Sequence, residues 1–137
     1  MSNFFANAEL VIDGVAYLDP KEVAAALEQG ALLVDLREDY LVTMKTFTVS
    51  EILYLPNSQF HGHIGELPKD RPLIFTDAVG LYSKDAVKLL QERGFDNVAV
   101  LNGGISAWED AGMPTAADPD EQWRGSCMCQ LRPRRKP

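Results

Sequence analysis

The chain has 137 residues, 46% of them hydrophobic, and a formal net charge of −7 at pH 7. This length predicts one domain with a hydrophobic core, and the apolar content excludes a chain that stays disordered. The negative charge argues against a general nucleic-acid or membrane-surface binder. No apolar run approaches the roughly 20 residues that a membrane-spanning helix needs.

The first ten residues, MSNFFANAEL, have neither the basic region nor the long apolar region of a secretory signal. The only two cysteines, Cys127 and Cys129, lie near the C-terminus. A disulfide scaffold would need more of them, spread along the fold. We therefore expect a cytoplasmic protein whose thiols are reduced at rest.

The first predicted elements are a short strand and a helix. Residues 15–20 (VAYLDP) contain a short extended piece. Asp19 can cap the helix that follows, Pro20 fits its first position, and Glu22 can close a capping box. Gly30 is expected to end this helix.

Four apolar runs predict the other strands. Residues 31–37 (ALLVDLR) and 72–77 (PLIFTD) are nearly continuous, which is typical of strands buried on both faces. Residues 51–56 (EILYLP) and 97–104 (NVAVLNGG) complete the set.

Helical patterns lie between these runs. Residues 38–47 are ambiguous and could form a short helix. Ser58 is expected to cap a short helix that carries Phe60, Ile64 and Leu67 inward.

Residues 82–93 predict an amphipathic helix that ends at Gly94, and residues 105–112 predict a last short helix. The broad apolar face of the first of these holds Ala86, Val87, Leu89 and Leu90. The alternation predicts an α/β fold: a parallel, doubly wound sheet of about five strands with helices on both faces. Reactive groups should lie at the carboxyl ends of the strands.

Three segments resemble the rhodanese (sulfurtransferase) domain family: residues 34–38 (VDLRE), the strand–loop–helix at 73–90, and residues 100–114 (VLNGGISAWEDAGMP). The last segment is the most specific, because it keeps Gly103, Gly104, Trp108, Gly112 and Pro114 in the family's order. The resemblance covers about residues 15–117. It implies a rhodanese-like domain over residues 1–118 and a tail over residues 119–137.

The resemblance also locates the family's catalytic loop, which runs Cys, two residues, Gly, one residue, Arg, then a small residue that opens a helix. Its cysteine takes a sulfur atom from an anionic donor and becomes a persulfide. In this chain the loop is Asp77, Ala78, Val79, Gly80, Leu81, Tyr82 and Ser83. Asp77 stands in place of the cysteine and Tyr82 in place of the arginine. The family's Gly-His-Ile-Pro-Gly-Ala segment after VDLRE is also missing.

An aspartate changes the chemistry of such a loop. Backbone N–H groups and a helix N-terminus there would lower the pKa of a thiol and favour its thiolate. The Asp77 carboxylate is already an anion, so it can take up these N–H groups itself and oppose a bound anion. A carboxylate forms no persulfide. We therefore expect the loop to be closed by Asp77 and to transfer no sulfur.

A second interpretation makes Asp77 a nucleophile that forms an acyl-phosphate. Such sites need Mg²⁺ held by further carboxylates, and Asp35, at the end of the neighbouring strand, can supply one. The more ordinary interpretation is that Asp35 makes structural hydrogen bonds and belongs, with Arg37, to the framework of the fold.

The tail carries the second candidate site. Cys127 and Cys129 form a C-x-C pair with Arg124 before it and a basic end, RPRRKP, after it. Positive neighbours lower the pKa of a thiol and raise its reactivity. Two thiols this close can form a disulfide, pass a persulfide from one to the other, or remain ordinary thiols on a chain end.

Other functions of the tail stay open at this stage. His61 and His63 could complete a metal site with the two cysteines, although they are more typical of surface residues. Trp123 could anchor the tail on the domain. The basic end could contact an acidic partner, an RNA or the acidic body of the chain itself.

Two functions of different class follow from the sequence. In the first, Cys127 and Cys129 perform sulfur relay or thiol redox chemistry on a rhodanese-like body, with an unidentified sulfur donor or acceptor. In the second, the chain is a non-catalytic module that binds an unidentified protein partner. Neither needs a cofactor or a resident metal.

Overall fold

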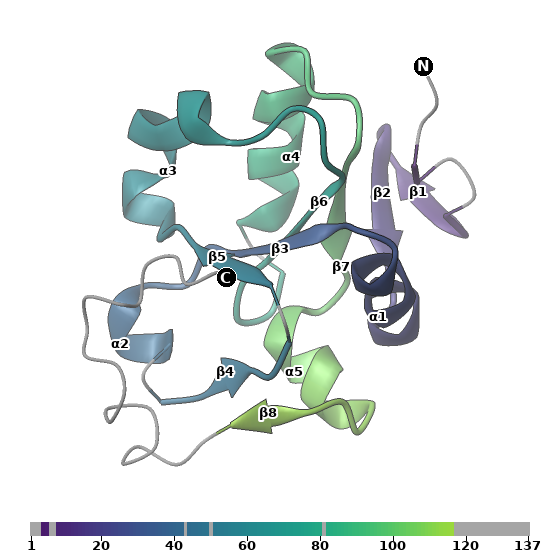
Figure 1. Ribbon diagram of the computed structural model, residues 1–137, viewed down its shortest axis with the longest axis vertical. Coiled ribbons are helices and arrows are strands. Elements are labelled where there is room, and N and C mark those ends of the chain that lie inside the picture. Colours follow the sequence, from purple (N-terminus) through teal and green to yellow (C-terminus); the bar gives the residue numbers. More distant parts are fainter. Residues whose placement is uncertain (1–3, 6–7, 43, 50, 81, 117–137) are drawn as a thin grey trace.

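A six-stranded sheet forms the centre of the molecule (Figure 1). The computed structural model describes residues 4–5, 8–42, 44–49, 51–80 and 82–116. The strands of this sheet are β1 (Leu10–Ile12), β2 (Val15–Leu18), β3 (Leu32–Asp35), β5 (Ile52–Tyr54), β6 (Leu73–Thr76) and β7 (Val98–Leu101). Their spatial order is β1-β2-β7-β6-β3-β5, and a separate pair joins β4 (Thr46–Phe47) to β8 (Thr115–Ala116).

The strands β2, β7, β6, β3 and β5 pair in parallel with their neighbours in this order, whereas β1 pairs with β2 in the antiparallel direction. The predicted parallel sheet of about five strands is therefore confirmed, and β1 adds a sixth strand at its edge. The strands β1, β4 and β8 are not among those predicted from the sequence. Each has only two or three residues, too few to show a period.

Helices cover both faces of the sheet (Figure 1). The helices are α1 (Pro20–Glu28), α2 (Asp39–Val42), α3 (Asn57–His63), the 3-10 turn η1 (Ile64–Glu66), α4 (Ser83–Glu92) and α5 (Gly104–Asp110). One core cluster joins the sheet to α3, η1 and α4, and the other joins it to α1 and α5. Trp108 and Phe95 are buried, as predicted.

Several local predictions are confirmed in detail. The Asp19 carboxylate accepts the Glu22 N–H at 2.8 Å, and the Glu22 carboxylate accepts the Asp19 N–H at 2.9 Å, so the capping box of α1 is complete. Phe60 in α3, Ile64 in η1 and Leu67 just after η1 are buried, as predicted.

The prediction that Ser58 caps α3 is wrong. The helix begins at Asn57, and Ser58 lies in its first turn. Its N–H and its hydroxyl donate to the two oxygens of Glu38, at 3.0 and 2.9 Å. The Glu38 carboxylate thus accepts an N–H in the first turn of α3 in place of a local cap. The sequence pattern of α3 alone does not reveal this acceptor. The ambiguous residues 38–47 contain the short helix α2 and the strand β4.

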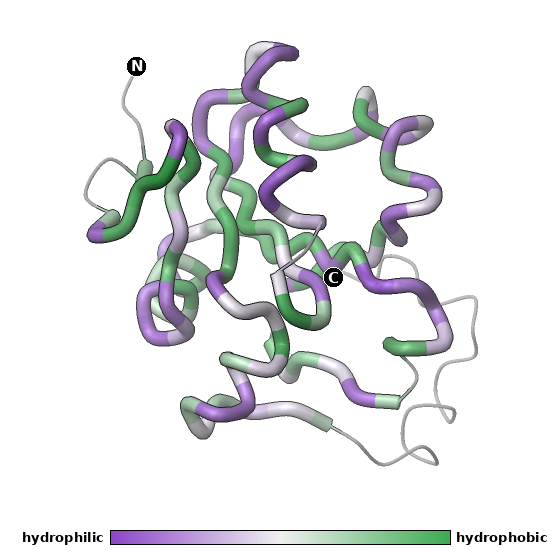
Figure 2. The backbone as a smooth tube through the Cα atoms, turned by 180° about the vertical axis from the view of Figure 1, so that it is seen from behind, coloured by the Kyte–Doolittle hydropathy of each residue, from purple (hydrophilic) through white to green (hydrophobic). Residues whose placement is uncertain are grey.

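Hydropathy separates the inside of the molecule from most of its surface. In Figure 2 the strands near the middle of the sheet are hydrophobic, and β1 is a hydrophobic stretch at the sheet edge. Its three side chains, Leu10, Val11 and Ile12, are 41, 55 and 48% exposed. Within the described ranges, no helix is both long enough and apolar enough to cross a membrane.

Candidate functional site

Two carboxylates lie at the carboxyl edge of the sheet. Asp35 is the last residue of β3, and Asp77 directly follows β6. The two strands pair in parallel with Asp35 opposite Thr76. Asp35 is 0% exposed and Asp77 is 2% exposed. Parallel pairing therefore places both acids where an α/β fold usually builds its site.

The Asp77 carboxylate is bound by the backbone of its own loop. One oxygen accepts the N–H of Gly80, and the other accepts the N–H groups of Tyr82, at 2.6 Å, and Ser83, at 3.1 Å. Gly80 has φ +99°, a left-handed conformation that few residues other than glycine adopt. These three bonds match the expectation that Asp77 takes up the loop N–H groups. They place its negative charge at the N-terminus of α4.

The N-terminus of α5 holds the other side of this loop. The N–H of Ile105 donates to the Asp77 carbonyl at 3.0 Å, and that of Ser106 donates to the Ala78 carbonyl at 3.2 Å. Gly104 has φ +62°, and a Cβ there would lie 2.3 Å from the Asp77 carbonyl oxygen. The glycine thus permits α5 to approach the loop backbone, which fixes the direction in which Asp77 points.

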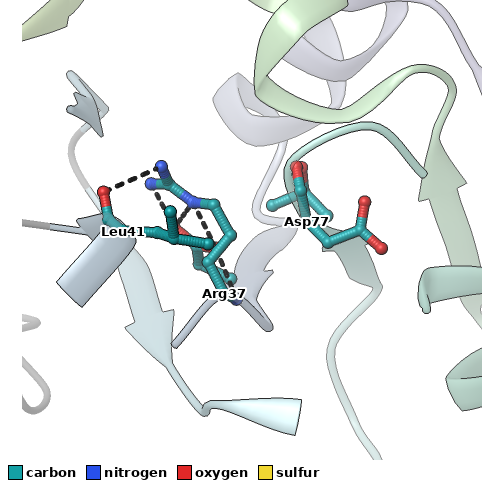
Figure 3. A network of polar contacts seen from close by, with 5 residues as sticks. Arg37, Leu41 and Asp77 are labelled. Atoms are coloured by element: carbon teal, nitrogen blue, oxygen red, sulfur yellow. Dashed lines mark hydrogen bonds and ion pairs between the residues drawn. The ribbon is translucent and has the colours of Figure 1, made fainter. Parts of the chain in front are cut away.

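Asp35 is paired with Arg37. The Arg37 Nη2 lies 2.8 Å from one Asp35 oxygen, and Nε lies 3.0 Å from the other. A further guanidinium nitrogen lies 3.5 Å from the Leu41 carbonyl (Figure 3). Figure 3 also shows the Asp77 carboxylate pointing away from this guanidinium. Arg37 therefore neutralises Asp35 and not Asp77.

Burial raises the pKa of Asp35 above its usual value, although hydrogen bonds and attraction from Arg37 lower it in part. The nearby charge of Asp77 raises it further. Among the described residues, no three His, Cys, Asp or Glu side chains are grouped so that they could hold a metal ion. The contacts of Asp35 agree with its structural interpretation, and the described residues offer no metal-holding group to support the acyl-phosphate interpretation of Asp77.

A pocket of about 220 Å³ opens beside the loop. Its lining includes Arg37, Glu38, Tyr40, Asp77, Val79 and Tyr82. Glu38 and Tyr40 are not among the site residues predicted from the sequence. Both follow the carboxyl end of β3, and the positional rule that selects Asp77 could have found them.

Ser83, the first residue of α4, is fully buried. Its hydroxyl has no hydrogen-bond partner among the residues that the structure describes. Of the predicted loop, Asp77, Ala78, Val79, Gly80, Tyr82 and Ser83 are brought together at the start of α4, and Leu81 lies outside the described residues.

The predicted tail site, Cys127 and Cys129, lies outside the described residues, and so do Trp123 and the basic end. The boundary between residues 118 and 119 therefore stays a prediction. His61 lines a second pocket, of about 350 Å³, with Asp85 and Glu92. His63 Nδ1 lies 3.2 Å from a Glu66 oxygen.

Known proteins are similar to this chain in sequence and in fold. The family model described as "Rhodanese-like domain" matches residues 19–111. "Thiosulfate sulfurtransferase GlpE" of Pseudomonas savastanoi pv. phaseolicola is 30% identical over 108 residues, which cover 79% of this chain and 94% of that protein. The protein of the same name from Shewanella oneidensis is 42% identical over 57 residues, or 42% of this chain and 56% of that protein.

Among solved structures, a rhodanese-related protein from Thermoplasma volcanium superposes with a TM-score of 0.67. The match has 20% sequence identity and covers 74% of this chain and 98% of that one. At this identity the likeness shows the fold alone.

Proposed function

Because this chain belongs to the rhodanese-like domain family, we propose that Asp77 has closed the family's loop to sulfur transfer. The three hydrogen bonds from the loop N–H groups to the Asp77 carboxylate carry this proposal. They occupy the donors that would otherwise stabilise a thiolate or an anionic sulfur donor, and they fix a negative charge at the same point. The sulfurtransferase activity named for the relatives therefore does not come from this loop.

Sulfur or thiol chemistry in this chain is assigned to Cys127 and Cys129. The support is their spacing and their basic neighbours, Arg124 and the RPRRKP end. A thiolate of this pair attacks the outer sulfur of thiosulfate. One S–S bond forms, another breaks, and sulfite leaves with the electron pair. The second thiolate can then attack the first cysteine sulfur, which forms a disulfide and releases hydrosulfide. A small thiol reductant resets the pair.

Mass spectrometry after incubation with thiosulfate or a small persulfide tests this assignment. The wild-type chain should gain one sulfur atom on the peptide that holds Cys127 and Cys129, and the Cys127→Ser/Cys129→Ser chain should gain none. The same double variant should show no thiosulfate:cyanide turnover above background. Turnover by the double variant would refute the closed loop, because no cysteine remains in that chain.

A second candidate function is a non-catalytic binding module. The observation that favours it is the aromatic pocket beside the loop, where Tyr40 and Tyr82 are 68 and 51% exposed. A wild-type chain that takes up no sulfur and forms no disulfide under oxidation would support this function over the relay. In either function the chain works in the cytoplasm with reduced thiols, and it binds neither membranes nor nucleic acids in general.

A further inference from the structure

Three large, exposed hydrophobic side chains line the pocket beside Asp77, and a fourth, Met44, lies close to one of them in the sequence. Tyr40 is 68% exposed, Met44 65%, Val79 55% and Tyr82 51%. Tyr40, Val79 and Tyr82 line the pocket, and Met44 closely follows α2, which carries Tyr40. Elsewhere in the described ranges, large apolar side chains are exposed in this way only on β1. Apolar side chains gathered at the mouth of a pocket indicate a surface that another segment covers.

The pocket is also acidic. Glu38 and Asp77 lie in its wall, and the only cation in its described lining, Arg37, is already bonded to Asp35. Asp77 already accepts the N–H groups of Gly80, Tyr82 and Ser83, so an incoming anion meets a negative charge where these three donors are taken. These surroundings favour a positively charged segment that also carries an aromatic or aliphatic side chain.

The described chain ends in a strand whose partner strand contacts a residue of the pocket. Ala116 is the last residue of β8, whose Thr115 pairs with Phe47 of β4. The Arg37 guanidinium lies 5.6 Å from the centre of the Phe47 ring, and Arg37 lines the pocket. Phe47 and Arg37 therefore connect the end of the described chain to the pocket.

The composition of residues 117–137 matches what the pocket favours. Trp123 supplies a large aromatic side chain, and the five basic residues are Arg124, Arg132, Arg134, Arg135 and Lys136. With its three acidic residues, this segment has a net charge of +2. The chain as a whole has −7, so residues 1–116 carry −9. An extended chain covers about 3.3–3.6 Å per residue, so Trp123 can reach roughly 25 Å from Ala116 and Cys127 roughly 40 Å. A tethered segment also meets its site at an effective concentration of the order of millimolar.

We propose that residues 117–137 dock on the pocket of the same chain, with Trp123 against Tyr40, Val79 and Tyr82 and the basic residues near Glu38. Docking brings Cys127 and Cys129 beside the family's catalytic loop, which the chain itself no longer uses. The inference deepens the proposed function by giving the thiol pair a place. It does not require either thiol to carry sulfur.

Paramagnetic relaxation in the full-length chain tests the docking. A nitroxide is attached to Cys127 in a Cys129→Ser chain labelled with ¹⁵N. We expect the amide signals of residues 36–41 and of Ala78, Val79, Tyr82 and Ser83 to broaden. Signals at the opposite edge of the sheet, such as Gly30 and Gly94, should stay sharp. Because opposite charges hold the segment in part, about 1 M salt should weaken the broadening.

Two matched variants separate docking from general attraction to an acidic surface. Val79 and Val11 are both 55% exposed, and only Val79 lines the pocket. Val79→Asp should abolish most of the broadening around the pocket, whereas Val11→Asp on β1 should leave it unchanged. A folded ¹⁵N spectrum confirms that each variant is intact.

Three results would overturn the inference: broadening confined to residues next to Ala116, equal loss in both valine variants, or broadening in a mixed sample of ¹⁵N chains and separate nitroxide-labelled chains. The last result would assign the contact to a second copy. The sulfur-uptake experiment reads out chemistry, and this one reads out position. Docking without sulfur uptake would support the docking and refute the sulfur relay. Sulfur uptake without docking would support the relay and refute the docking.

Discussion

Replacing Asp77 with alanine would leave the N–H groups of Gly80, Tyr82 and Ser83 without their acceptor. A hydrogen bond to a charged group contributes about 1.5–3 kcal/mol, and these three share one carboxylate. Water from the adjoining pocket can replace part of the loss, because the Gly80 and Tyr82 bonds are only partly buried. We therefore expect the free energy of unfolding to fall by about 2–4 kcal/mol.

The same substitution should open an anion site. Three free N–H groups at the start of α4 form the kind of concave donor set that binds oxyanions. If thiosulfate binds there with a dissociation constant of about 1 mM, then 10 mM thiosulfate restores about 1.4 kcal/mol of stability. The assay is urea unfolding with and without thiosulfate, on chains that also carry Cys127→Ser and Cys129→Ser so that no thiol reacts.

Two controls isolate the loop from general salt effects. The parent chain with Asp77 should gain no more from thiosulfate than from chloride at equal ionic strength. Asp19→Ala also removes a carboxylate that accepts an N–H at a helix N-terminus. It should cost about 1 kcal/mol and bring no response to thiosulfate. Two results would refute the reasoning: an Asp77→Ala chain that is as stable as its parent, or a parent chain that thiosulfate stabilises as much as the Asp77→Ala chain.

Three further predictions follow from the same contacts. Gly104→Ala should cost at least about 2 kcal/mol in urea unfolding, because its Cβ would meet the Asp77 carbonyl. Gly112→Ala, at φ +81° with open space, should cost about 1 kcal/mol; equal losses would count against the close approach. Asp35 should titrate above 3.8 in carboxyl ¹³C spectra, so that its ionisation lowers the free energy of unfolding as pH rises from 3.8 through its folded pKa. A midpoint below 3.8 would show that Arg37 outweighs burial. Asp77→Cys, in a chain without Cys127 and Cys129, should gain one sulfur atom from thiosulfate by mass spectrometry; an unmodified chain would mean that the loop lacks more than its thiol.

The sheet and its main helices could be predicted because each carries a strong local signal. Continuous apolar runs gave the buried strands β3 and β6, and the capping box of Asp19 and Glu22 gave the start of α1. The bonds of Asp77 could also be foreseen, since a carboxylate at a strand–helix junction lies within reach of the loop's own N–H groups.

The features that could not be predicted depend on contacts between segments far apart in the sequence. Ser58 carries the signature of a cap, yet Glu38, twenty residues earlier, fixes its N–H and hydroxyl. The strand β4 exists because Phe47 pairs with Thr115 near the other end of the domain. The pocket follows from the same kind of contact, because Tyr40 and Tyr82 line one pocket only once β3 and β6 lie side by side.

A crystal structure of the chain soaked in thiosulfate at neutral pH tests most directly whether Asp77 closes the loop to anions. The hydrogen bonds described above predict an Asp77 carboxylate that still accepts the N–H groups of Gly80, Tyr82 and Ser83, with no anion between them. A thiosulfate held by those three N–H groups, with the carboxylate turned aside, would contradict it.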